Sequence, residues 1–166
     1  MKLTLADEQH IRDTEGWLEL GDVISAFKAL EEIDPQHRAH PKVLRLRWQI
    51  YAKAKKWSNA FTVAEGLTRV APSEVLPFVW RSYSARRMKG GSVAQAFELL
   101  RDVSDDFPDE PLVAFNGACY LCQVGRLDEA RTWLQRCFVA AEKSGEAKTY
   151  RRRAGDEPDL EPLRKK

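Results

Sequence analysis

The chain has 166 residues, 43% of them apolar, and a formal net charge of +2 at pH 7. This size suits one domain with an ordinary hydrophobic core. No apolar run approaches the roughly 20 residues that span a bilayer, which excludes a membrane-spanning protein. Three cysteines make no disulfide framework, and the N-terminus does not resemble a signal peptide, so we expect a cytoplasmic protein.

Charge is distributed unevenly along the chain. Residues 1–37 carry 3 basic and 9 acidic side chains, whereas residues 38–89 carry 12 basic and 2 acidic ones. Residues 90–147 carry 5 basic and 10 acidic side chains, and residues 148–166 carry 7 and 4. The basic block predicts a local positive potential that attracts acidic partners.

The first half of the chain predicts two helix pairs. The first pair is expected at about 7–20 and 22–33, with Asp22 as the N-cap of its second helix. After a linker with two prolines, the second pair begins near Pro41, and its second helix is expected from Ser58, as N-cap, to about Val70.

The second half predicts two more pairs and a tail. A third pair follows Pro77, with its turn at Gly90 and Gly91, Ser92 as N-cap and a second helix at 93–105. The fourth pair covers 111–144. The polar tail, 147–166, is expected either to add a short helix at about 147–153 that covers the end of the array or to form a flexible arm.

These helix pairs form an internal repeat. Four alanines mark equivalent positions at spacings of 34, 36 and 34 residues: Ala26, Ala60, Ala96 and Ala130. Glycine stands five residues before the alanine in three copies of four. Apolar residues stand three before and seven after it in every copy, and three copies carry phenylalanine next to it. Agreement at many independent positions indicates stacked helical hairpins.

This pattern resembles the tetratricopeptide repeat (TPR), most specifically in the fourth unit, NGACYLCQVGRLDEARTWL. The resemblance implies an all-α fold: a TPR-like right-handed superhelix of four antiparallel helix pairs plus a short C-terminal extension. The repeat domain is then 1–146, in units of about 7–40, 41–76, 77–110 and 111–144, and the tail is 147–166.

The resemblance also implies where a partner binds, because the first helices of TPR units line a concave face that takes a peptide or a partner's helix. The candidate partner-binding residues at these positions are Lys42, Arg45, Gln49, Lys53, Arg81, Ser82, Lys89, Phe115 and Asn116. The family's carboxylate clamp is only partly matched, because Ala85 and Cys119 stand where asparagine is expected. The alternative is that these charges simply form solvated helix faces.

Other motifs give no support for catalysis or a cofactor. His37 and His40 have a spacing that a metal could use, but no third ligand is near in sequence, so we interpret them as solvated turn residues. Cys119 and Cys122 lie one turn apart within a predicted helix, without the βαβ context of a redox site, and are interpreted as packing residues.

The sequence therefore predicts a non-enzymatic interaction module or adaptor, without cofactor or metal, that binds an acidic peptide or partner segment in a basic groove. Two alternatives stay open. Nucleic acid could bind the basic central repeats, which predicts a linear fall of log affinity with log salt concentration. The chain could instead be a structural subunit of a larger assembly.

Overall fold

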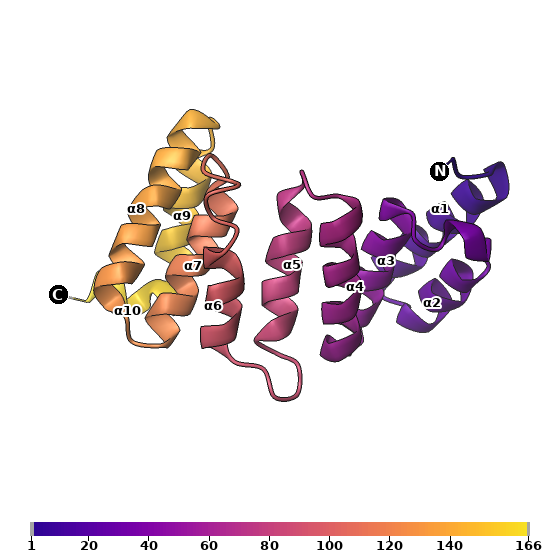
Figure 1. The fold of residues 1–166 in the computed structure, drawn as a ribbon, viewed down its shortest axis with the longest axis horizontal. Coiled ribbons are helices and arrows are strands. Elements are labelled where there is room, and N and C mark those ends of the chain that lie inside the picture. Colours follow the sequence, from indigo (N-terminus) through magenta and orange to yellow (C-terminus); the bar gives the residue numbers. More distant parts are fainter. Residues whose placement is uncertain (1, 166) are drawn as a thin grey trace. The chain divides into compact units, whose positions relative to one another are not determined.

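The structure, a computed structural model, describes residues 2–165, and within that range the chain is all-helical with no strand. The α-helices are α1 (Leu5–Glu19), α2 (Val23–Glu31), α3 (Pro41–Lys53), α4 (Trp57–Val70), α5 (Val75–Ala85), α6 (Val93–Arg101), α7 (Pro111–Gln123), α8 (Leu127–Lys143), α9 (Ala147–Asp156) and α10 (Glu161–Arg164) (Figure 1). Two 3₁₀ turns, η1 (Pro35–His37) and η2 (Pro158–Leu160), complete the elements. None of these helices is both long and apolar enough to cross a membrane.

The chain forms two compact units, residues 1–84 and residues 85–166. In the first unit, α1 packs on α2, α3 packs on α4, and α1 and α3 also lie against each other. In the second unit, α7 packs on α8, and α6, α9 and η2 pack around this pair. The superhelix, the repeat count and the boundary between repeat domain and tail stay predictions.

Side-chain caps confirm two of the three predicted N-caps. Asp22 accepts a hydrogen bond from the backbone N–H of Ser25 (2.9 Å), and Ser92 accepts one from Gln95 (3.1 Å). The prediction for Ser58 is wrong: α4 begins at Trp57, and its N-cap is Lys56, whose side chain makes no capping bond. A backbone hydrogen bond from Lys56 N–H to the Tyr51 carbonyl (2.8 Å) sets this start instead.

The turns within the helix pairs use a left-handed residue. Gly21 and Gly125 have φ of 78° and 79°, the conformation for which glycine has no steric penalty. In the third turn this residue is Gly90 rather than the repeat-aligned Gly91. The fold requires glycine at position 91 for a different reason. A Cβ there would lie 1.8 Å from the Ala85 carbonyl oxygen.

The repeat positions form the core. All four marker alanines are 0% exposed, and so are Ile33, Leu67 and Cys137, which stand seven residues after three of them. The marker alanines are small, and they let the two helices of a pair approach closely. The predicted extension of the sixth helix to residue 105 is wrong: α6 ends at Arg101, and Val103 and Ser104 are buried in the turn that follows.

Candidate functional site

A groove runs between α1 and α3 in the first unit. It consists of two adjoining hollows of about 240 and 410 Å³ that share Glu15, Leu46 and Gln49 in their lining. All four site residues predicted on α3 line it: Lys42, Arg45, Gln49 and Lys53. Their helical spacing of three to four residues places them on one face of α3, and the packing of α1 beside α3 supplies the opposite wall.

The groove has an apolar floor between charged walls. Ile11, Leu18 and Leu46 line it and are 4–5% exposed. The α1 wall carries Glu8, Arg12, Glu15 and Glu19. The groove is therefore basic on its α3 side and mainly acidic on its α1 side, a combination that the count of charges along the sequence does not reveal.

Two of the predicted basic residues are already paired within the chain. Lys42 Nζ lies 3.3 Å from Glu8 Oε1, and the Arg45 guanidinium binds the Glu74 carboxylate. The side chains in these pairs are 30–52% exposed, so the pairs contribute little stability, typically 0–1 kcal/mol. Solvated ion pairs of this kind can exchange one carboxylate for another.

The other lysine of the groove, Lys53, binds a backbone carbonyl. Lys53 Nζ donates to the Leu18 carbonyl oxygen at 3.1 Å and is exposed. Outside the groove, Arg47 pairs with Glu31 at 2.5 Å, and Arg38 pairs with the same carboxylate at 3.4 Å. Acidic side chains of residues 1–37 thus neutralise part of the basic block, residues 38–89, once the helices pack.

Arg81 and Ser82 on α5 have different environments. The Arg81 guanidinium carbon lies 5.7 Å from the centre of the Phe78 ring, and its Nε is buried without a hydrogen-bond partner among the described residues. Ser82 is 0% exposed, and its hydroxyl donates to the Val79 carbonyl at 2.9 Å. Arg81 is half-buried and Ser82 has no accessible surface, and neither residue lines the groove between α1 and α3.

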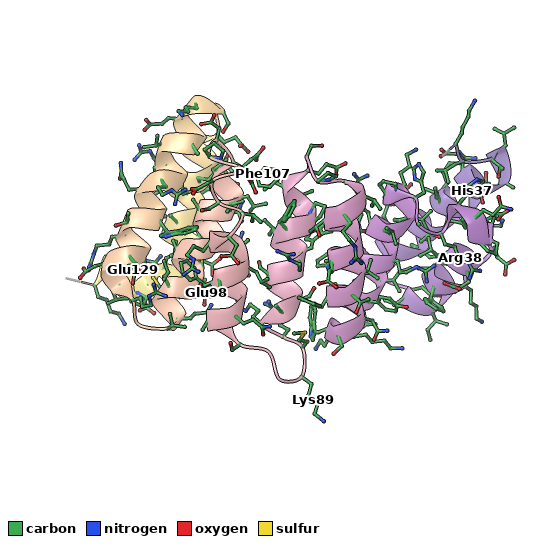
Figure 2. The ribbon with its side chains drawn as sticks, viewed as in Figure 1. His37, Arg38, Lys89, Glu98, Phe107 and Glu129 are labelled. Carbon is green, nitrogen blue, oxygen red and sulfur yellow. The ribbon has the colours of Figure 1, made fainter. Side chains whose placement is uncertain are left out.

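The other three predicted residues belong to the second unit and do not join the groove. Lys89 is exposed in the loop before α6 (Figure 2). Phe115 is 2% exposed and packs edge-to-face on Tyr150 of α9, with ring centres 5.7 Å apart. Asn116 donates its amide to the Leu112 carbonyl of its own helix (2.8 Å).

Two tryptophans of the first unit stack on each other. Trp48 and Trp80 stack face to face, with ring centres 4.4 Å apart and an interplanar angle of 5°. The Trp48 indole N–H donates to the Ser84 hydroxyl at 3.1 Å. Both indoles are only partly buried, and Trp48 directly precedes Gln49 of the groove. The repeat offered no signal for this stack, because the 36-residue spacing aligns Trp48 with Ser84 and not with Trp80.

The interpretation of His37 as a solvated turn residue is wrong. Its Nδ1 lies 2.7 Å from Oδ2 of Asp7, which is 2% exposed. The same carboxylate accepts hydrogen bonds from the Thr4 N–H, the Thr4 hydroxyl and the Asp34 N–H. This network joins the start of α1 to the linker after α2. No group of three or more potential ligands in residues 2–165 is arranged to hold a metal ion.

The Asp7 network predicts acid sensitivity. Hydrogen bonds from Thr4, chiefly that of its side chain, hold the pKa of Asp7 well below its ordinary value of 3.8. The lowered pKa stabilises the fold above pH 3.8, and this contribution is lost as the pH falls below that value. We expect the melting temperature of Asp7→Asn to fall less steeply than that of the wild type between about pH 4 and 2, by circular dichroism. Asp106→Asn, at an exposed turn, is the control and should retain the wild-type slope.

The three cysteines are buried. Burial and the nearby Asp159 carboxylate raise the pKa of the Cys119 and Cys122 thiols, and Glu157 adds to the effect at Cys119. Burial raises the pKa of Cys137 to about 12. A thiol that stays protonated is a poor nucleophile and a poor metal ligand.

Solved structures of MamA, a TPR-repeat protein, have the same fold. MamA (residue 41 to the end) from Desulfovibrio magneticus RS-1 covers 99% of this chain and 100% of its own, with a TM-score of 0.67 and 13% identity. MamA MSR-1 covers 84% and 76%, with a TM-score of 0.64 and 17% identity. MamA AMB-1 covers 92% and 99%, with a TM-score of 0.59 and 16% identity.

No protein-family model and no curated protein matches the chain. At these identities the structural likeness establishes the fold alone. The chain thus has a TPR-like fold.

Proposed function

We propose that this TPR-like protein is a non-enzymatic adaptor that holds an acidic segment of a partner protein along the groove between α1 and α3. The groove carries the proposal, because the four residues that the repeat pattern selected on α3 line it together. Its floor of Ile11, Leu18 and Leu46 suits the apolar side chains of a bound segment, and its α3 wall suits the segment's carboxylates.

Partner carboxylates have two kinds of cation to bind. Lys42 and Arg45 hold chain carboxylates through partly exposed pairs, which a partner's Asp or Glu can replace without leaving a charge buried. Arg81, half-buried on α5 and outside the lining of the groove, offers a charge-assisted bond to a carboxylate of a segment that extends beyond the groove. Gln49 supplies an amide for the backbone of the bound segment.

The mixed charge of the groove favours protein over nucleic acid. Glu8, Glu15 and Glu19 line the α1 wall, opposite the basic residues of α3, and repel a phosphate backbone. A peptide can place carboxylates toward α3 and neutral or basic groups toward α1, which also fixes its direction in the groove. Charge in such a site sets specificity and association rate more than affinity.

Charge reversal at two positions tests the proposal. We expect Arg45→Glu with Arg81→Glu to weaken partner binding by more than about tenfold with unchanged helicity, because both substitutions repel the acidic segment. The measurement is co-purification with the tagged protein from its native host, followed by mass spectrometry, and titration of each partner recovered.

The control is Lys56→Glu with Arg69→Glu, which changes the net charge equally at two exposed positions outside the groove, the N-cap and the last turn of α4. A partner retained by the control and lost from the groove variant supports the proposal. Equal retention by both variants contradicts it, and binding of nucleic acid with a linear log–log salt dependence would favour the alternative.

A further inference from the structure

The C-terminal segment, residues 157–164, lies against α7 in the second unit. The Asp159 carboxylate accepts a hydrogen bond from the Gln123 side-chain amide and lies 4.0 Å from the Arg86 guanidinium. Leu160, the next residue, is 1% exposed. An acidic side chain and a buried leucine thus make a two-point contact with a folded helix pair.

The surface under this segment corresponds to the groove of the first unit. Gln123 and Cys119 stand at the repeat positions of Lys53 and Gln49, which line the groove on α3. Glu157 and Asp159 lie close enough to Cys119 to raise the pKa of its thiol. α3 and α7 are the first helices of their pairs. The face that lines the open groove on α3 is therefore covered on α7 by the chain's own acidic segment.

The segment has little regular structure of its own. η2 and α10 contain only 3 and 4 residues, too few to be stable helices by themselves. Arg164 donates to the carbonyl oxygens of Ala154 in α9 (2.7 Å) and of Glu157 (3.0 Å), so its hydrogen bonds hold the end of the segment to α9 and to its own first residue rather than to α7. α9 is anchored separately, through Tyr150 and Phe115, so the segment can leave α7 without α9.

We propose that the surface formed by Gln123 and Cys119 of α7, together with Arg86 from the turn after α5, is a second peptide-binding site, filled in cis by the segment 157–164 and able to bind in trans an acidic segment with an Asp-Leu pair. Arg86 and Gln123 select the carboxylate, and the cavity that Leu160 fills selects the leucine. Because the tethered segment has an effective concentration in the millimolar range, it keeps the site closed to weak ligands. This site is separate from the groove between α1 and α3.

The test uses a fluorescein-labelled peptide of residues 157–165 and the full-length protein. We expect Leu160→Ala to loosen the tethered segment, so that the free peptide binds this variant at least about tenfold more tightly than the wild type in fluorescence anisotropy. Leu20→Ala, at a leucine 77% exposed in the other unit, is the control and should bind as weakly as the wild type. Adding Arg86→Glu and Gln123→Ala to Leu160→Ala should abolish binding.

A folded Leu160→Ala protein that binds the peptide no better than the wild type would overturn the proposal. If that variant loses helicity, hydrogen exchange on the wild type decides: excess peptide should speed exchange in residues 157–164 while α7 stays protected. Unchanged exchange in that segment would equally overturn it. Arg45→Glu with Arg81→Glu should leave peptide binding intact, so this proposal and the groove proposal fail independently.

Discussion

Replacing Phe97 by alanine is expected to destabilise the second unit by about 3–5 kcal/mol, the usual range for removing a buried aromatic ring. Phe97 is 2% exposed, and its ring meets Trp133 of α8 edge-to-face with centres 5.1 Å apart. The Arg126 guanidinium covers the same ring at 5.1 Å. Urea unfolding followed by circular dichroism measures the loss as a lower transition midpoint for this unit.

Phe27 is the matched control, because it occupies the same repeat position beside a marker alanine but is 36% exposed. We expect Phe27→Ala to cost about 1 kcal/mol, near the centre of the range for point substitutions. Equal losses for the two variants would mean that burial of this position does not differ between the units.

Replacing Gly117 by alanine is expected to destabilise the same unit by about 1–2 kcal/mol, although alanine is the better helix former by about 1 kcal/mol. A Cβ at this position in α7 would lie 2.2 Å from Cε3 of Trp133. Trp133 is 8% exposed and packed against Phe97, so its ring has little room to move. The measurement is again urea unfolding of the full-length protein.

Gly16→Ala tests the helix-propensity part of that argument alone. Gly16 lies within α1, and no atom stands within 4 Å of a Cβ built there. We expect this variant to be stabilised by up to about 1 kcal/mol. A Gly117→Ala protein as stable as Gly16→Ala would show that the Trp133 ring can move aside without loss of stability.

The helices were predictable because their signals are local or periodic. Asp22 and Ser92 cap helices through bonds to residues three positions later, which a sequence pattern reports directly. Ser58 is not the cap, because the turn that contains the backbone bond from Lys56 to Tyr51 places the N-cap of α4 at Lys56, two residues earlier. In the same way, the end of α6 depends on burial of Val103 and Ser104, which periodicity does not report.

The candidate site was predictable only in part. The residues selected on α3 share a face because helix geometry places them there. Their charge state was not predictable, because the carboxylates beside Lys42 and Arg45 come from residues 34 positions before and 29 positions after. Burial of Ser82 and Phe115 likewise depends on packing of the folded unit, as the contact of Phe115 with Tyr150 shows.

Sequence alone determined the repeat, the all-helical class and the face of α3 that lines the groove, because each follows from spacing along a helix. Tertiary structure decided which charges pair, which aromatic rings stack and where the C-terminal acidic segment lies. These depend on distances between residues far apart in the chain, which only packing of the apolar faces establishes.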